Sequence, residues 1–178
     1  MNGLKLFTPT TYVKDVFEVT PSRLREKGIQ AVITDLDNTL IEWNRSFATD
    51  AINEWIRTLQ QEGFQVVIMS NNNEERVQKF CEPLGLTYFA RANKPLQSAY
   101  KEARKLFNVP DEAIVCIGDQ IMTDIIGANR AGLQSILVLP VTQSDAKATK
   151  FNRFVESKIM ARLKKKGLQV KEGSLWNN

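Results

Sequence analysis

Short apolar runs alternate along the chain with longer segments of helical periodicity. The runs have the length and composition of buried strands, and they predict strands over residues 31–34, 66–69, 87–89, 114–117 and 135–139. Apolar residues spaced three and four apart predict helices over residues 47–61, 74–82, 95–107 and 121–131. Alternation of strands and helices favours right-handed crossovers and a mostly parallel sheet covered on both faces. The pattern therefore predicts an α/β fold: a Rossmann-like, doubly wound sheet of five strands.

Residues with special backbone preferences mark several ends of these elements. Pro95 is expected at the first position of its helix, because its fixed φ suits that position. Gly132 follows the last predicted helix directly and is expected to end it. Gly28 and Gly63 each precede a strand and indicate turns.

Charge is distributed unevenly along the 178 residues, which we expect to form a single domain. Residues 147–178 hold nine Lys or Arg and two acids, so they carry +7, whereas residues 1–146 carry −3. A slightly acidic body suits a cation site better than a nucleic-acid groove. We predict a catalytic core at about 29–140, an N-terminal arm at 1–28, and a basic helix and tail at about 147–178.

The basic C-terminal segment has two interpretations. Its apolar residues fall within about half the circumference of a helix, and they are Phe151, Phe154, Val155, Ile159 and Leu163. Such a helix either packs on the edge of the sheet or lies on anionic lipid. The N-terminal arm has the same two interpretations, packing on the core or docking on a surface, because it carries the apolar residues Tyr12, Val13 and Val16.

Missing residue types exclude several mechanisms. The chain has no histidine, so a Ser-His-Asp triad, a phosphohistidine and a His-ligated zinc are excluded. Neither Cys81 nor Cys116 begins a Cys-x5-Arg loop, and both are expected to be reduced core residues. No apolar run is long enough to span a membrane, and we expect a cytoplasmic protein. Acid–base chemistry is left to carboxylates, lysines and hydroxyls.

Polar side chains follow four of the predicted strands where each strand ends. The carboxyl ends of parallel strands meet at one edge of a sheet, where ligands bind. The residues concerned are Asp35, Asp37, Asn38 and Thr39, then Ser70, Asn71, Asn72 and Asn73, then Lys94, and finally Asp119 and Asp124. Taken singly, such residues are common as turns and helix N-caps, but together they predict a ligand site at this edge of the sheet.

The spacing of these residues resembles the four motifs of the haloacid dehalogenase superfamily. Asp35-Leu36-Asp37-Asn38-Thr39 matches its Asp-x-Asp-x-Thr signature, and Ser70, Lys94 and Gly118-Asp119-x4-Asp124 match the other three motifs in order. The segments Ser70-Asn71-Asn72 and Asn93-Lys94-Pro95 are similar to the small YqeG-like branch of subfamily IIIA, which is related to mitochondrial phosphatidylglycerophosphate phosphatases. The resemblance covers about residues 31–139.

This resemblance implies a role for each matched residue. Asp35 would attack phosphorus and form an aspartyl-phosphate, with Asp37 as general acid and base, assisted by Lys94 and Ser70. Asn38, Thr39 and Asn71 would contact the substrate. Mg²⁺ would lie on Asp35, the Asp37 backbone carbonyl and Asp119, with Asp124 binding it directly or through water. A dehalogenase needs no acid at position 37, so Asp37 favours a phosphatase.

The resemblance also implies an open site, because both places where this superfamily inserts cap domains are short here. An open site suits large substrates such as a protein or a lipid headgroup. Together with the basic tail, the resemblance to the branch related to phosphatidylglycerophosphate phosphatases implies such a phosphatase, cytoplasmic or peripheral at the inner face of the membrane. A phosphatase for a soluble phosphate ester or phosphoprotein is the alternative, and a non-catalytic phosphate-binding module is a third hypothesis. A nucleic-acid partner is not expected, and the oligomeric state is left open.

Overall fold

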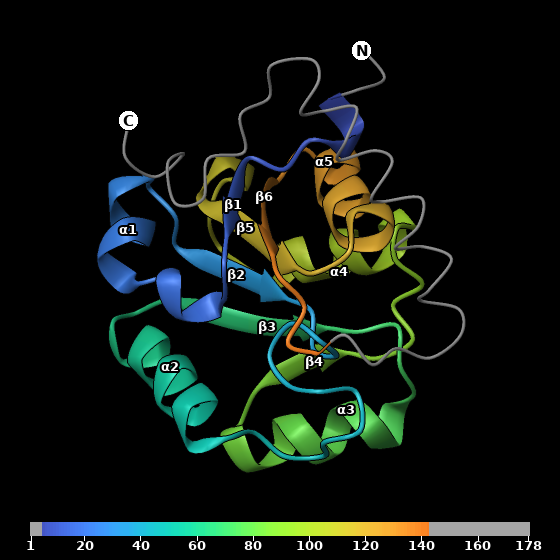
Figure 1. The fold of residues 1–178 in the computed structure, drawn as a ribbon. Helices are drawn as coiled ribbons and strands as arrows, with labels where there is room; N and C mark the ends of the chain where they lie inside the picture. The colour runs from blue at the N-terminus through green and yellow to red at the C-terminus, as the bar shows by residue number, and fades with distance from the viewer. Residues whose placement is uncertain (1–4, 143–178) are drawn as a thin grey trace.

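The computed structural model describes residues 5–142, and its centre is one parallel sheet (Figure 1). The strands lie in the order β1-β6-β5-β2-β3-β4. Their bounds are β1 Thr11–Val13, β2 Ala31–Thr34, β3 Gln65–Met69, β4 Thr87–Phe89, β5 Ile114–Gly118 and β6 Gln134–Val138. β3 and β4 follow on one side of β2, and β5 and β6 follow on the other, so the direction of the strand order reverses between β2 and β5. Ligands bind at such a reversal in open α/β sheets.

Helices cover both faces of the sheet, as predicted (Figure 1). One face is covered by α1 Pro21–Glu26, α2 Asp50–Gln61 and α3 Glu74–Cys81, and the other by α4 Gln97–Leu106 and α5 Ile126–Ala131. A π-helical turn, Ile121–Ile125, leads into α5, and short 3-10 turns lie at Lys5–Phe7, Val16–Glu18, Glu82–Leu84 and Asp111–Ala113.

The strands are apolar throughout because both of their faces are buried. In β2, Val32 packs under α2 and α3, whereas Ala31 and Ile33 pack under α4 and α5. Cys81 and Cys116 lie one in each of these two cores as free, buried thiols, which confirms the prediction. No helix among residues 5–142 is long and apolar enough to cross a membrane.

The sheet has one strand more than predicted. β1 comes from the N-terminal arm and pairs with β6, with Thr11 opposite Ile136 and Val13 opposite Val138. Val13 and Leu24 are fully buried, so the described part of the arm packs against the core. The sequence leaves this arm open between packing and surface docking, and it predicts no strand there. The basic helix predicted at about 147–178 lies outside the described residues.

Two predicted helix starts are wrong, while the predicted glycine turns are confirmed. α2 begins at Asp50 and not at residue 47, because the Thr49 side chain caps it. α4 begins at Gln97, so Pro95 precedes the helix and is not its first residue. Gly132, at φ +76°, ends α5.

Candidate active site

The carboxyl ends of β2, β3 and β5 bring the predicted site residues together. Thr34 of β2 lies opposite Ile68 of β3 and Ile117 of β5, so the polar residues that follow the three strands meet at one edge. A pocket of about 290 Å³ opens there, lined by Asp35, Asp37, Ser70, Asn71, Asn72, Lys94, Gln120 and Thr123. Gln120 and Thr123 were not among the predicted site residues, although both lie within the Asp119–Asp124 motif.

Lys94 forms ion pairs with two aspartates at the floor of this site. Its Nζ lies 2.6 Å from Asp35 Oδ1 and 2.7 Å from Asp124 Oδ1, and the Lys94 and Asp124 residues are only 7% and 4% exposed. Burial by itself lowers the pKa of Lys94, but Asp124 and Asp35 outweigh it and raise this pKa. Burial raises the pKa of Asp124 to about 6, against the opposing charge of Lys94. The lysine is therefore a fixed positive charge beside Asp35.

Three carboxylates gather next to this ammonium. Asp35, Asp119 and Asp124 each offer an oxygen, and these oxygens lie within 4.8 Å of one another. The Thr39 hydroxyl bridges two of them, 3.4 Å from Asp35 Oδ2 and 3.3 Å from Asp119 Oδ1. Three carboxylates and one ammonium leave two negative charges. An all-oxygen, doubly negative cluster fits a hard divalent cation such as Mg²⁺.

Gly118 explains how Asp124 reaches this cluster. A Cβ at position 118 would lie 2.3 Å from Cγ of Asp124, so the aspartate side chain packs directly against the backbone at the end of β5. The Gln120 N–H donates to Asp124 Oδ2 at 3.1 Å and holds it there. Only glycine at position 118 permits this approach.

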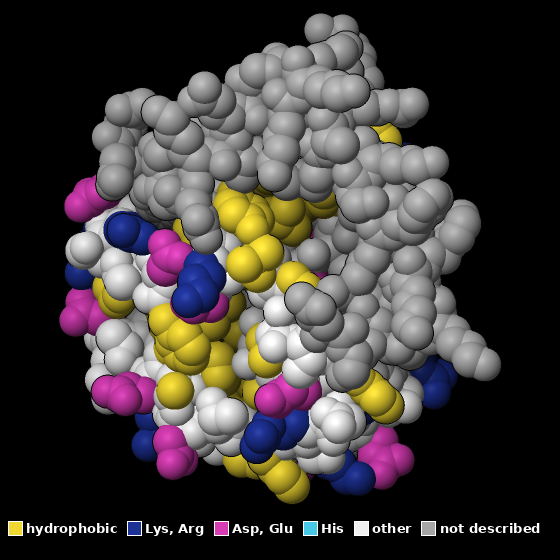
Figure 2. All heavy atoms as spheres, in the orientation of Figure 1, with side chains coloured by type: hydrophobic (Ala, Val, Ile, Leu, Met, Phe, Trp, Pro, Cys, Tyr) yellow, Lys and Arg dark blue, Asp and Glu magenta, His cyan; other side chains and the backbone are white. Residues whose placement is uncertain are grey.

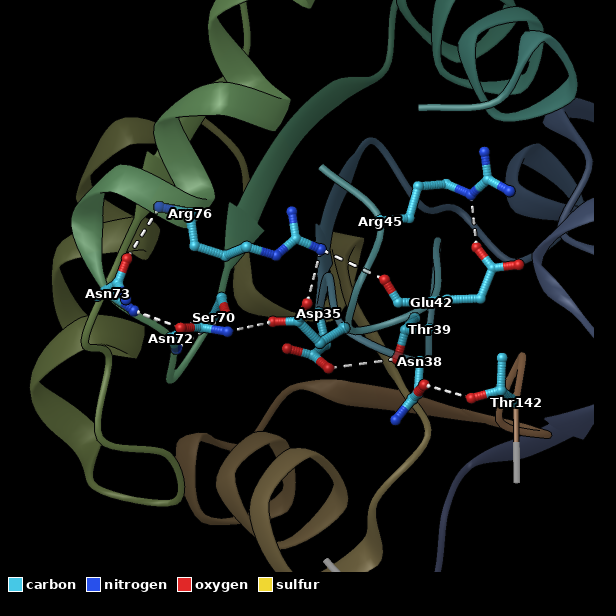
Figure 3. Close-up of polar contacts among 11 residues, drawn as sticks. Asp35, Asn38, Thr39, Glu42, Arg45, Ser70, Asn72, Asn73, Arg76 and Thr142 are labelled. Carbon is cyan, nitrogen blue, oxygen red and sulfur yellow. Dashed lines mark hydrogen bonds and ion pairs between the residues drawn. The ribbon is translucent and has the colours of Figure 1, made fainter. Parts of the chain in front are cut away.

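Two side chains from the start of α3 and the segment before it, Arg76 and Asn72, hold Asp37. Figure 3 shows both of them. The Asn72 amide donates to Asp37 Oδ2 at 3.1 Å, and Arg76 Nη2 donates to Oδ1 at 2.8 Å. Burial raises the pKa of Asp37, whereas Asn72 and Arg76 oppose that rise. Arg76 was not predicted. It is 39 residues from Asp37 along the chain, and no sequence pattern connects the two.

The segment after β3 supports the site through its own hydrogen bonds. The Lys94 N–H donates to Asn71 Oδ1 at 2.6 Å, and Asn71 Nδ2 donates to the Lys94 carbonyl at 3.2 Å. Ser70 Oγ accepts from the Asn72 N–H, and Asn73 caps α3 by accepting from the Arg76 N–H. The helix-cap interpretation of this segment is confirmed for Asn73.

Asn38 lies in the left-handed region, at φ 64°, and faces the chain that follows β6. Its carbonyl accepts from the Val141 N–H at 2.8 Å, and its Oδ1 accepts from the Thr142 hydroxyl at 3.2 Å. Neither Asn38 nor Thr39 lines the pocket. Thr39 instead contacts the carboxylates of Asp35 and Asp119.

Comparison with known proteins gives the family. The model of the haloacid dehalogenase-like hydrolases matches residues 10–132. The chain is 46% identical over 163 residues to the Probable phosphatase YqeG of Bacillus subtilis, which covers 92% of this chain and 95% of that protein. It is 24% identical over 178 residues to the chloroplastic/mitochondrial Phosphatidylglycerophosphate phosphatase 1 of Arabidopsis thaliana, covering 94% of this chain and 51% of that protein.

A solved structure agrees with the fold. The cobalt-bound deoxy-D-mannose-octulosonate 8-phosphate phosphatase YrbI of Haemophilus influenzae superposes with a TM-score of 0.54 at 21% identity, over 65% of this chain and 70% of that one. Fold, ordered motifs and relatives agree, and they place this chain among the haloacid dehalogenase-like hydrolases as a phosphatase.

Proposed function

We propose that this phosphatase is a Mg²⁺-dependent phosphomonoester hydrolase that works through an aspartyl-phosphate on Asp35, with phosphatidylglycerophosphate as its substrate. The observation that carries the proposal is the buried ion pair of Lys94 Nζ with Asp35 Oδ1 at 2.6 Å, beside Asp119 and Asp124. A carboxylate is repelled by a phosphate dianion, so a nucleophilic aspartate requires fixed positive charge beside it.

Asp35, Asp119 and Asp124 would hold Mg²⁺, together with the backbone carbonyl of Asp37. When bound, the ion supplies positive charge that offsets the repulsion between the phosphate and the carboxylates. Thr39 contacts Asp35 and Asp119, so we assign it to positioning these ligands.

In the first step, a carboxylate oxygen of Asp35 attacks phosphorus. The bond from phosphorus to the ester oxygen breaks as the new oxygen–phosphorus bond forms. Asp37 gives its proton to the departing ester oxygen, so the alcohol leaves neutral. Lys94 and the Ser70 hydroxyl, both at the pocket, stabilise charge on the phosphoryl oxygens.

In the second step, a water molecule attacks the same phosphorus from the pocket. Asp37, now ionised, takes a proton from that water, and the bond from phosphorus to Asp35 breaks. Inorganic phosphate leaves and both aspartates return to their starting states. Asn71 fixes the Lys94 backbone, and Asn38 anchors the loop after β2 to the chain after β6.

The size of the pocket and the exposed apolar side chains of the protein favour a lipid substrate. The pocket is about 290 Å³, which is at the small end for ligand sites, so the phosphate enters while the rest of the molecule stays outside. Trp43, Phe47 and Val141 are 47%, 60% and 46% exposed. Figure 2 shows hydrophobic side chains gathered on one face, with charged side chains around its edge. Such a surface suits peripheral attachment to a membrane.

A vesicle assay tests the substrate. Phosphate release is measured with Mg²⁺ from phosphatidylglycerophosphate in anionic vesicles and from a panel of soluble phosphate esters, for the wild type and Asp35→Asn. We expect release from the lipid by the wild type and none by the variant. If phosphate were released only from soluble esters, the proposed mechanism would stand, but phosphatidylglycerophosphate would not be the substrate. Equal results for both proteins on every substrate would overturn the mechanism itself.

A further inference from the structure

Arg76 is a largely buried cation that the two-step reaction leaves without a role. Its side chain is 13% exposed, and Nη2 pairs with Asp37 Oδ1 at 2.8 Å. The same nitrogen also donates to the Glu42 carbonyl at 3.4 Å (Figure 3). Within the described part of the chain, Nε and Nη1 are buried without a hydrogen-bond partner. Burying guanidinium donors without hydrogen-bond partners lowers the stability of the folded protein, so stability alone does not explain this arginine.

The two oxygens of Asp37 have different surroundings. Oδ2 accepts from Asn72, which lines the pocket, whereas Oδ1 accepts from Arg76, which does not. Asn72 is itself oriented, because its Oδ1 accepts from the Asn73 N–H at 2.8 Å. The amide therefore turns its NH₂ group toward Asp37. One oxygen is on the pocket side and the other is anchored behind it.

We propose that Arg76 is a positioning residue for the acid–base step, an inference that rests on the proposed role of Asp37. Arg76 holds Oδ1, and Oδ2 exchanges Asn72 for the leaving oxygen of the substrate. When the substrate ester is cleaved, the proton on Oδ2 passes to the leaving oxygen. The Asp37 carboxylate that results already has the guanidinium beside it, which stabilises the negative charge formed in that step.

The location of Arg76 agrees with this role. Asn73 caps α3 by accepting from the backbone N–H of Arg76, so the start of that helix is fixed by the same segment that carries Asn72. Arg76 thus connects α3 to Asp37 and to Glu42, both on the loop that follows β2.

The proposal is tested by the dependence of rate on the leaving group. The p-nitrophenolate of an aryl ester such as p-nitrophenyl phosphate leaves without being protonated. The alkyl oxygen of an ester such as glycerol phosphate must be protonated as it leaves. Asp37→Asn should lower kcat/KM on the alkyl ester by roughly 10²–10⁴ and much less on the aryl ester. Arg76→Met should show the same selectivity at a smaller size, roughly 10- to 100-fold on the alkyl ester.

The control is Lys79→Met, which removes a positive charge from the exposed side of the same helix and should leave both rates unchanged. In an Asp37→Asn background, Arg76→Met should cause no further selective loss. Arg76→Lys keeps the positive charge but has a shorter side chain, and it tests the proposal if the Met variant does not fold. Its loss should again be selective for the alkyl ester but smaller than that of the Met variant. Equal losses on both esters would make Arg76 merely structural and overturn the proposal. No selectivity in Asp37→Asn itself would instead overturn the acid role of Asp37.

Discussion

Replacing Lys94 with methionine separates the electrostatic part of the site from its packing. Methionine keeps a long apolar side chain and removes the ammonium that contacts Asp35 and Asp124. The variant leaves Asp35, Asp119 and Asp124 clustered without the Lys94 charge. Two contacts of 2.6 and 2.7 Å correspond to roughly 6 kcal/mol of Coulomb attraction each at an effective dielectric constant of about 20, before desolvation is counted.

The net cost is smaller because burying the lysine is itself unfavourable. Breaking a buried ion pair by removing one partner costs about 3–5 kcal/mol, and in a domain of this size each kcal/mol lowers Tm by about 2–4 °C. Lys94→Met should therefore lower the Tm of the metal-free protein by about 6–20 °C.

Mg²⁺ should reverse part of this loss. The wild-type cluster carries two net negative charges and the variant three, so the cation gains more from binding the variant. By linkage, a ligand that binds the folded state raises its stability, and Mg²⁺ should raise the Tm of Lys94→Met more than that of the wild type. At saturating Mg²⁺, kcat of the variant should nevertheless stay roughly 10²–10³-fold below that of the wild type, because the positive charge next to the phosphoryl group is missing.

Thermal melts with and without Mg²⁺ measure both effects, alongside phosphate release. Lys79→Met, which breaks an exposed ion pair with Glu75, is the matched control and should melt like the wild type. A Lys94→Met protein that melts like the wild type without Mg²⁺, or that gains no more than the wild type from Mg²⁺, would refute the coupling between the ammonium and the carboxylates.

Three further predictions concern the cation and the core. Gly118→Ala places a Cβ 2.3 Å from Asp124 Cγ and should weaken Mg²⁺ binding measured by calorimetry; unchanged binding would contradict the packing argument. The pKa of Asp124 is raised from 3.8 to about 6 in the folded protein. The folded state therefore binds this proton more tightly than the unfolded state, and the free energy of unfolding of the metal-free protein falls as pH rises from about 4 to about 6. Since protonated carboxylates bind cations poorly, Mg²⁺ should raise Tm more at about pH 7.5 than at about pH 5, and equal shifts would argue against Asp124 as a ligand. Trp55→Phe removes the 3.0 Å hydrogen bond to the Val19 carbonyl and should cost about 1–3 kcal/mol in chemical denaturation with kcat unchanged; a fall in kcat would show that Trp55 has a role beyond packing.

The parts of the fold that could be predicted are the strands whose burial is visible in the sequence as an apolar run. β2 and β5 are buried on both faces, so they read as unbroken apolar runs, and the residues after them must meet at one edge. Asp35 and Asp119 were predicted for that reason, and Lys94 from its motif spacing.

The parts that could not be predicted depend on contacts between distant segments. β1 has only three residues and forms because β6 offers it an edge. α4 begins after Pro95 because the Asn71 side chain holds the Lys94 backbone in the preceding loop. Arg76 faces Asp37 because α3 follows the segment that carries Asn72, and its own sequence context is that of an ordinary surface helix.

Trapping the phosphoryl group on the enzyme tests whether Asp35 is the nucleophile. Asp37→Asn should still accept a phosphoryl group from an aryl ester, but it cannot activate the water that removes it. Acid quenching, digestion and mass spectrometry should then find one phosphoryl group on Asp35 of this variant and none in Asp35→Asn. A phosphoryl group on another residue, or wild-type turnover by Asp35→Asn, would contradict Asp35 as the nucleophile.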